Sequence, residues 1–415
     1  MSETKEHHRL AVLTSHPIQY QAPLFRRLAE HPRVDLTVYF CSDQGLAVSR
    51  DPEFGVSFKW DRPLLEGYSS RFLANVSPFR ASTGLWRAIN PGVVSHLWQG
   101  NFDAVLVHGY ALATNWLGFA AARLRRTPIL LHGETFERDP GQSGPRRWAK
   151  RTALSALFRQ VAAFLPIGSK SVEFYESFGV SRERMFLTPY SVDNDFFIAE
   201  AERLTGRRDA LKAELGIARD VPVCLYLSKL IPRKRPMDCL QAFEPLQDRA
   251  ALVFVGDGER RPALEGYVRD RGVRNVHFMG FRNQSELSRF YALADVFLLP
   301  SAFETWGLVV NEAMCFGLPV VVADGAACSF DLVRDGENGY VVPTGDVATL
   351  AGRLETLVGD GELRRRMGRR SSEMIATWGH RECVDGIVGA LDRVRFESKR
   401  ASSKGGRVIR AEPEL

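Results

Sequence analysis

The chain has 415 residues, of which 45% are apolar, 25% charged and 10% aromatic. This composition is typical of a globular protein with two or three domains, and it excludes fibrous, collagen-like and wholly disordered classes. The net charge of +6 is unevenly placed: residues 62–159 carry thirteen Lys and Arg against five Asp and Glu, a local charge of +8, and the rest of the chain carries −2.

Cysteine usage and hydropathy indicate the compartment. Six cysteines lie far apart, form no CxxC pair and mostly occur in apolar runs: Cys41, Cys224, Cys239, Cys315, Cys328 and Cys383. They predict buried thiols in a reducing cytoplasm, and neither a disulfide framework nor a zinc site. The N-terminal residues lack the apolar core of a signal peptide, and no stretch approaches the ~18 uninterrupted apolar residues of a membrane span.

The first half of the chain alternates short β-branched runs with helical patterns. Strands are predicted at 10–15, 34–40, 102–109, 128–134 and 162–169, and helices at 23–30 and 116–124. Strands separated by helices of about 10 to 15 residues indicate βαβ units and a parallel sheet covered on both faces. Residues 44–95 do not fit this alternation, and loops and short helices over the edge of the sheet are expected there.

Residues 144–165 form a strongly basic helical pattern. Basic residues and Trp148 crowd one end, and an apolar stripe of Leu154, Leu157, Phe158, Val161 and Phe164 follows. Such a helix could lie on an anionic membrane surface with the Trp and Arg side chains at headgroup level. The alternative is a solvated helix whose stripe packs on the sheet. Nucleic acid is not expected as a partner, because no helix-turn-helix, RNA-binding or zinc motif accompanies the charge.

A second series of strands begins after a charged helical stretch at 201–217. Strands are predicted at 221–228, 251–258, 276–280, 296–301, 319–324 and 339–343, with helices between them. The predicted fold class is α/β, with two doubly wound parallel-sheet (Rossmann-like) domains that face a central cleft at the carboxyl ends of their strands. The first domain is predicted at 1–200 and the second at 201–385, followed by a helix end and a disordered basic tail within 386–415.

The stretch 298–345 carries the most informative motif. A strand end is followed by Glu304, and a helix is predicted to begin near Trp306, so that the N–H groups of Trp306, Gly307 and Leu308 form an anion site. Glu312 lies about two turns beyond Glu304, and both carboxylates could face the cleft. Hydroxyl-binding carboxylates beside an anion site suit a nucleotide sugar. The alternative is a capping carboxylate at Glu304 and a surface position for Glu312.

Cations and glycines that precede this motif in the sequence are predicted to line the same cleft. Lys229 follows a strand and Lys234 lies in a Pro-flanked turn, where both could neutralise a diphosphate leaving group. The strand at 251–258 ends in Gly256-Asp257-Gly258. This turn is a weak dinucleotide-binding motif, because Arg261 stands in place of the third glycine, and a turn that admits a base or ribose fits better.

The order of these motifs resembles the retaining GT-B glycosyltransferases of family 4, also called glycosyltransferase group 1, over essentially the whole second half. The resemblance implies that Glu312 binds the nucleotide's ribose, that Glu304 sits at the donor sugar, and that Lys229 and Lys234 bind the diphosphate. Phe281 falls where the family's backbone contacts the base. The chain departs from the family pattern at Lys229, where Arg is usual, at Trp306, where Phe is common, and at Arg235, where the family has glycine.

The first half resembles the family more loosely. His16, Gln19 and Tyr20 follow the opening strand and are expected to line the acceptor side of the cleft, and His132 ends a strand where the family commonly has a functional histidine. For both histidines, a purely structural role at a strand end is the alternative. Asp193-Asn194-Asp195 imitates a metal-binding D-x-D motif, but the resemblance implies no metal and no cofactor, so a helix cap is predicted there.

The resemblance therefore implies transfer of a sugar from a nucleoside-diphosphate sugar to an acceptor, with retention of the anomeric configuration. Glu304, Lys234 and His132 are the candidate catalytic residues. The expected partners are the nucleotide sugar, a glycan or lipid-linked acceptor and an anionic membrane surface, and the expected location is the cytoplasm or the inner membrane face. The alternatives are a nucleotide-sugar 2-epimerase of the same architecture and a non-catalytic nucleotide-sugar-binding protein.

Overall fold

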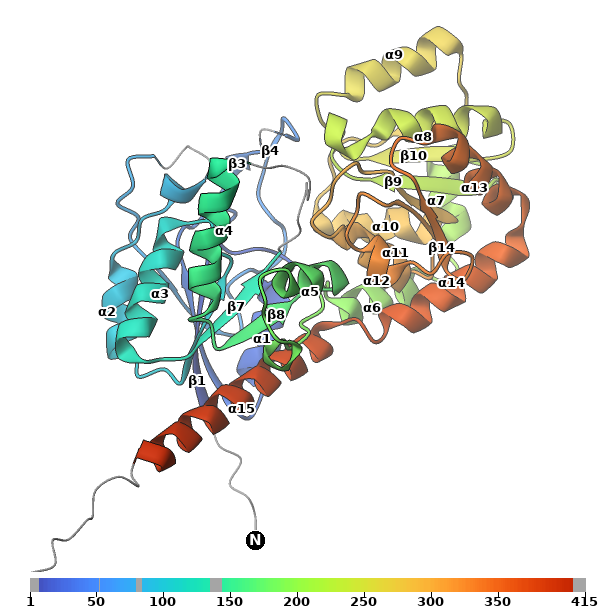
Figure 1. Ribbon diagram of the computed structural model, residues 1–415. Helices are drawn as coiled ribbons and strands as arrows, with labels where there is room; N and C mark the ends of the chain where they lie inside the picture. Colours follow the sequence, from blue (N-terminus) through green and yellow to red (C-terminus); the bar gives the residue numbers. More distant parts are fainter. Residues whose placement is uncertain (1–6, 52, 80–83, 135–143, 406–415) are drawn as a thin grey trace, which may run out of the picture.

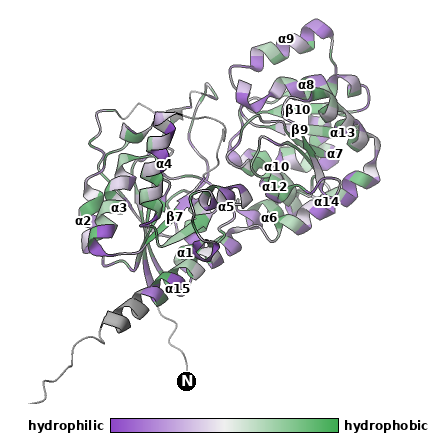
Figure 2. Ribbon diagram, in the orientation of Figure 1, coloured by the Kyte–Doolittle hydropathy of each residue, from purple (hydrophilic) through white to green (hydrophobic). Residues whose placement is uncertain are grey.

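Two parallel six-stranded sheets organise the computed structural model, which describes residues 7–51, 53–79, 84–134 and 144–405 (Figure 1). Each sheet is covered by helices on both faces, and the C-terminal helix runs back from the second domain along the first. The central strands are apolar and the outer helices are mixed or hydrophilic (Figure 2). The expected α/β architecture of two doubly wound domains is confirmed.

The first sheet has the strand order β5-β2-β1-β6-β7-β8. Its strands are β1 (His8–Thr14), β2 (Val34–Phe40), β5 (Ser69–Phe72), β6 (Ala104–His108), β7 (Ile129–Gly133) and β8 (Ala163–Pro166). Its helices are α1 (Ala22–Glu30), α2 (Gly92–Gln99), α3 (Ala113–Arg125), α4 (Pro145–Phe158) and α5 (Ser169–Glu176), with 3-10 turns η1 (Leu85–Arg87) and η2 (Arg182–Arg184). The central strands are buried on both faces, which explains their continuous apolar runs.

Residues 44–95 contain strands that the sequence did not predict. Strand β5 pairs in parallel with β2 and forms the edge of the first sheet, although three of its four residues, in the sequence SSRF, are exposed. A short antiparallel hairpin joins β3 (Ser49–Arg50) and β4 (Ser57–Phe58). The rest of the described part of this segment consists of loops, the turn η1 and helix α2, as expected.

The second sheet has the strand order β11-β10-β9-β12-β13-β14. Its strands are β9 (Val223–Leu227), β10 (Ala251–Val255), β11 (Val276–Phe278), β12 (Val296–Leu299), β13 (Val320–Ala323) and β14 (Gly339–Val342). Its helices are α6 (Asn194–Leu204), α7 (Arg208–Glu214), α8 (Pro236–Phe243), α9 (Arg261–Arg271), α10 (Gln284–Leu293), α11 (Leu308–Cys315), α12 (Ser329–Leu332), α13 (Val347–Gly359) and α14 (Gly361–Ile375), with turns η3 (Pro232–Lys234) and η4 (Glu244–Leu246).

Both sheets reverse their strand order at one point. In the first sheet the two strands that flank this point are β1 and β6, and in the second they are β9 and β12. In open α/β sheets, loops leave such a pair of strands in opposite directions and open a crevice at the carboxyl ends. The fold therefore predicts one binding crevice in each domain.

Helix α15 (His380–Gly405) ties the two domains together. It leaves the second domain and packs its apolar side, which includes Ile387 and Leu391, into the core of the first domain. Asp392 on this helix accepts a hydrogen bond from His8 Nε2 at 3.0 Å and from Arg33 Nη1 at 3.1 Å. The helix continues past residue 398, where the sequence analysis expects a disordered tail, and residues 406–415 of that tail lie outside the described part.

Helix α4 shows which interpretation of the basic segment is correct. It ends at Phe158, so the expected helix over 144–165 is too long, and Phe164 belongs to strand β8. Leu154, Leu157 and Phe158 are 2–4% exposed and pack in the core of the first domain. Their stripe therefore packs on the sheet, while Trp148 is 71% exposed.

Candidate active site

The crevice of the second domain brings together the predicted cations and carboxylates. Lys229 follows β9 and Glu304 follows β12, the two strands that flank the reversal of strand order. Lys234 ends η3, and its ammonium forms an ion pair with Glu304 Oε1. Ser301 Oγ donates to the same oxygen at 3.2 Å. Residues 70 positions apart thus meet because two neighbouring parallel strands end at the same edge.

Burial alters the chemistry of the Lys234 ammonium. Desolvation, together with the nearby positive charges of Arg233 and Lys229, lowers the pKa of Lys234 from 10.5 to about 7. Glu304 is only 9% exposed, and Arg233 Nη1 lies 3.9 Å from its Oε2. A diphosphate entering this place would supply the negative charge that restores the protonated lysine.

The loop after β12 is held against the loop that follows β13. The Glu304 N–H donates to Gly325 O at 3.0 Å, and Gly307 then adopts a φ of 109° at the N-cap of α11. A Cβ on Gly307 would lie 2.9 Å from Leu299 Cδ2, so glycine is needed there for close packing. Helix α11 begins at Leu308, two residues later than expected. Trp306 is 2% exposed and stacks on Trp378 at 5.6 Å, which leaves only its backbone for a ligand.

Glu312 is fully buried, so its alternative placement on the surface is wrong. Tyr291 Oη donates to its Oε2 at 2.5 Å, and its Oε1 has no partner. Burial raises the pKa of Glu312 from 4.5 to about 7, and the hydroxyls of Tyr291 and Tyr20 oppose this rise. A buried carboxylate of this kind is unusual, because buried polar groups are generally hydrogen-bonded.

Gly256 and Gly258 allow two strand ends to approach each other. A Cβ on Gly256 would lie 2.0 Å from Ser228 O, and one on Gly258 would lie 2.6 Å from Leu230 O. The glycines therefore pack the end of β10 against the loop that carries Lys229. Asp257 is held locally, because its Oδ2 accepts from Arg261 Nη1 at 2.8 Å.

A cavity of about 140 Å³ lies beside these glycines. Its lining includes Lys229, Gly256, Phe281 and Gln284 of the second domain and Gln19 of the first. Gln19, expected on the acceptor side, thus faces the predicted donor-binding residues. The Oε1 atoms of Gln19 and Gln284 are buried and have no hydrogen-bond partner in the described part of the chain.

The crevice of the first domain is larger, at about 900 Å³. It lies at the carboxyl ends of β1, β2, β5 and β6, and polar side chains line it, including Ser42, Asn75, Arg87, His108 and Asn115. Its size and polar lining suit a hydroxyl-bearing molecule.

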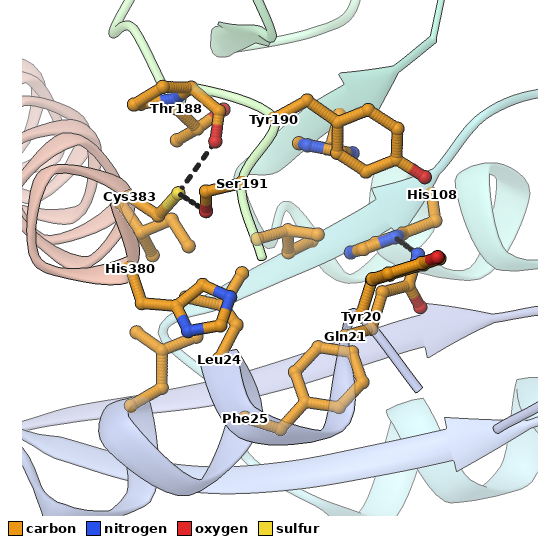
Figure 3. A pocket seen from close by; sticks show the side chains of 15 residues that line it. Tyr20, Gln21, Leu24, Phe25, His108, Thr188, Tyr190, Ser191, His380 and Cys383 are labelled. Atoms are coloured by element: carbon orange, nitrogen blue, oxygen red, sulfur yellow. Dashed lines mark hydrogen bonds between the residues drawn. The ribbon is translucent and has the colours of Figure 1, made fainter. Parts of the chain in front are cut away.

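Two neighbouring histidines lie at the carboxyl ends of β6 and β7. His132 and His108 pair across β7 and β6, and their ring centroids are 4.6 Å apart. Burial lowers the pKa of His132 to about 4 and that of His108 well below its ordinary value, so both rings are neutral near pH 7. His132 lines a small cavity of about 20 Å³, shown in Figure 3, whereas His108 lines both that cavity and the large crevice.

His108 thus lines the candidate site without having been predicted there, although its position after the apolar run 104–107 is the same strand-end signal that singled out His132. His16 forms a hydrogen bond of 2.9 Å with the Ser15 hydroxyl. Burial, and to a lesser extent the charge of Arg87, lowers the pKa of His16 to about 4.

Glu134 follows strand β7 and links the two domains beside Glu304. It accepts hydrogen bonds from Tyr190 Oη at 2.6 Å and from Thr305 Oγ1 at 3.4 Å.

Comparisons with known proteins place the chain in a family. Residues 207–374 match the family model described as glycosyl transferases group 1, and residues 17–191 match the glycosyl transferase 4-like domain. A D-inositol 3-phosphate glycosyltransferase of Xylanimonas cellulosilytica is 32% identical over 302 residues, which cover 68% of this chain and 70% of the relative. The chain belongs to the group 1 glycosyltransferases.

Other relatives of this group 1 glycosyltransferase agree. A D-inositol 3-phosphate glycosyltransferase of Nocardia farcinica is 28% identical over 331 residues, covering 74% of this chain and 71% of the relative. The crystal structure of HepE from Anabaena in complex with UDP has a TM-score of 0.71 at 18% identity, and the match covers 92% of this chain and 99% of HepE. This structural likeness confirms the GT-B fold.

The structure explains one departure of this group 1 glycosyltransferase from the family pattern. Arg235, at the position of the usual glycine, adopts a left-handed φ of 50° between η3 and α8. Its side chain donates to Asp238 Oδ2 at 2.6 Å, which helps to offset the strain of about 1 kcal/mol that such a backbone costs a residue with a Cβ.

The D-x-D sequence of this glycosyltransferase is not a helix cap. Asp193 occupies the N-cap position of α6, but its side chain makes no capping hydrogen bond and lies 3.6 Å from Arg62 Nη2. Asp195 pairs with Arg27. Within the described ranges, no group of three or more His, Cys, Asp or Glu residues is placed to hold a metal ion. No helix in the described part of the chain is long and apolar enough to cross a membrane.

Proposed function

We propose that this protein transfers a glycosyl group from a nucleoside-diphosphate sugar to a hydroxyl acceptor, with retention at the anomeric carbon. The observation that carries the proposal is the partly buried ion pair of Lys234 and Glu304 at the point where the second sheet reverses its strand order. Glu312 lies on α11, the helix that follows Glu304. HepE, which shares the fold, is described in complex with UDP. The nucleoside is placed in the 140 Å³ cavity and its ribose hydroxyls at Glu312.

In this mechanism Lys234 exchanges its partner Glu304 for the diphosphate of the donor. Without donor, its ammonium pairs with Glu304. The diphosphate draws Lys234 and Lys229 towards its own oxygens, where positive charge stabilises the leaving group as the bond to the sugar breaks. Glu304 is then free to orient the sugar and to stabilise its partial positive charge. The leaving diphosphate takes the proton of the acceptor hydroxyl on the same face, and closure of the crevice excludes water.

The acceptor is placed in the 900 Å³ crevice of the first domain. His108, which lies beside the ring of His132, lines this crevice, and Arg87 supplies a positive charge to an anionic group. Relatives named for D-inositol 3-phosphate support an acceptor that combines hydroxyls with a negative charge. A glycan or lipid-linked acceptor of this charge type fits the basic first domain.

Substitutions at the buried pair test the proposal. Lys234→Ala and Glu304→Ala should each reduce turnover by orders of magnitude in a folded protein, while Glu362→Ala, in an exposed ion pair on α14, should leave turnover unchanged. Near-normal turnover of the first two variants would contradict the assignment. Thermal-shift measurements with UDP, GDP and ADP identify the nucleotide. Incubation of the donor without acceptor distinguishes a 2-epimerase, which would convert it into a new nucleotide sugar.

Association with membranes is a separate part of the proposal. The apolar stripe of α4 is buried, so contact with anionic lipid must come from exposed groups such as Trp148 and the basic side chains of the same helix. Co-sedimentation with anionic vesicles at low salt is the expected result, and salt should weaken it. No binding at low salt would remove the membrane from the proposal.

A further inference from the structure

The β3–β4 hairpin of the first domain, here its described residues 49–51 and 53–61, reaches the diphosphate-binding lysine of the second domain. Lys229 Nζ lies 3.0 Å from Asp51 Oδ2 and 2.8 Å from Glu53 Oε2. Arg233 Nη2 lies 3.6 Å from the other oxygen of Glu53. Two carboxylates thus occupy the place where the proposed function requires a diphosphate.

The same hairpin covers the cavity that the proposed function gives to the nucleoside. The ring of Phe281 lies 5.1 Å from that of Phe54 and 4.4 Å from that of Phe58, between centroids. Phe54 and Trp60 line the 140 Å³ cavity together with Phe281. A flat aromatic base in the cavity that these side chains line gains stacking energy of the kind measured for bases on aromatic side chains.

Hydrogen bonds also fix the far end of the hairpin to the second domain. Asn283 Nδ2 donates to Lys59 O at 2.6 Å, and the Ser285 N–H donates to Asp61 Oδ2 at 3.1 Å. Asn283 and Ser285 lie at the start of α10, next to Phe281 in the chain. The hairpin therefore contacts the second domain through charges at one end, aromatic rings in the middle and polar anchors at the other end.

We propose that the β3–β4 hairpin completes the donor site: Phe54 and Trp60 cover the nucleobase, and Asp51 and Glu53 hold Lys229 until the donor's diphosphate displaces them. This inference rests on the proposed function. The first domain then sets donor affinity in two opposite ways, because its rings add stacking and its carboxylates compete with the phosphate oxygens for the same ammonium.

The exchange at Lys229 does not require the hairpin to unfold. Asp51 Oδ1 also accepts the backbone N–H groups of Glu53 and Phe54, at 2.8 and 2.9 Å, and the Asp51 N–H donates to Val56 O at 3.0 Å. These bonds hold the turn when Lys229 leaves. Burial tends to raise the pKa of Asp51, but hydrogen bonds from the backbone and from Lys229 outweigh it and lower this pKa. The hydrogen bond with Lys229 lowers the pKa of Glu53, so both carboxylates are charged at neutral pH.

Two double variants separate the competition for Lys229 from the stacking on the base. Titration calorimetry measures their binding of UDP, GDP and ADP and of the matching nucleosides. Asp51→Asn with Glu53→Gln removes the competing charge. It should tighten binding of the preferred diphosphate about three- to tenfold and leave binding of its nucleoside unchanged, since each partly exposed ion pair contributes little. Phe54→Ala with Trp60→Ala should weaken binding of both ligands about tenfold or more.

A surface variant provides the matched control. Asp248→Asn with Glu355→Gln makes the same charge change on the second domain, where these residues pair with Arg274 and Arg249, and it should alter neither affinity. Unchanged or weaker diphosphate binding by the Asp51/Glu53 variant, or unchanged nucleoside binding by the Phe54/Trp60 variant, would overturn the inference. Failure of the parent protein to bind any of the three diphosphates would instead refute the proposed function, and the inference with it.

Discussion

Glu312→Gln provides a test of the buried carboxylate that does not depend on a known substrate. The pKa of Glu312 is raised from 4.5 to about 7, so the folded chain binds this proton more tightly than the unfolded chain does. As pH rises between these two values the unfolded state releases the proton first, and the free energy of unfolding falls. Above pH 7 the folded protein carries a desolvated negative charge, and the loss stops growing. At 1.36 kcal/mol per pKa unit, the loss approaches about 3 kcal/mol.

Glutamine keeps the shape of the side chain and removes the titration. We therefore expect Glu312→Gln to gain stability relative to the parent by about 2 to 3 kcal/mol between pH 5 and pH 8. Urea unfolding of both proteins at the two pH values measures this difference, and the exposed Glu362→Gln serves as control. The same variant should bind a nucleoside diphosphate more weakly, because an amide nitrogen replaces one hydrogen-bond acceptor. An equal stability change at both pH values would show that Glu312 is not a desolvated acid in the folded protein.

Three further predictions follow from particular contacts. Because the pKa of Lys234 is about 7, the lysine loses its charge above pH 7, and diphosphate affinity should fall by up to about tenfold per pH unit. Lys234→Arg should remove this dependence, which calorimetry from pH 6 to 9 measures. Gly256→Ala should lower both the melting temperature and diphosphate affinity, because its Cβ would lie 2.0 Å from Ser228 O, whereas Gly352→Ala, in open space on α13, should be neutral or slightly stabilising. Leu391→Ala should cost about 2 to 5 kcal/mol in urea unfolding, since Leu391 is 1% exposed between α15 and the first domain, and an unchanged midpoint would show that α15 does not stabilise this packing.

The sequence predicted the strands of both sheets well because parallel strands buried on both faces form continuous apolar runs. Strand β5 was not predicted because it lacks such an apolar run. Its polar sequence, Ser69–Phe72, lies at the edge of the sheet, where burial places little demand on composition. The end of α4 was misplaced because the apolar spacing continues through Val161 and Phe164, although Phe164 belongs to the next strand.

The candidate site was predictable where its residues form a local motif. Lys229, Lys234, Glu304 and Glu312 lie at strand ends or on the following turn or helix, and their order along the chain indicated the chemistry before any contact was known. Burial was not predictable, because it depends on what packs against each residue. The surface alternative for Glu312 was reasonable on spacing alone and is wrong because Tyr291, from α10, lies against it.

The sequence by itself determined the α/β class, the alternation of elements and the group of residues at the carboxyl edge of the second sheet, since hydropathy and strand-end motifs are local properties of the chain. Only the tertiary structure decided which distant residues meet. Lys229 contacts Asp51 from 178 residues away, and His108 stands beside His132 because β6 and β7 are neighbours in the sheet. Such contacts depend on strand order and on how the two domains face each other, and no local pattern encodes either one.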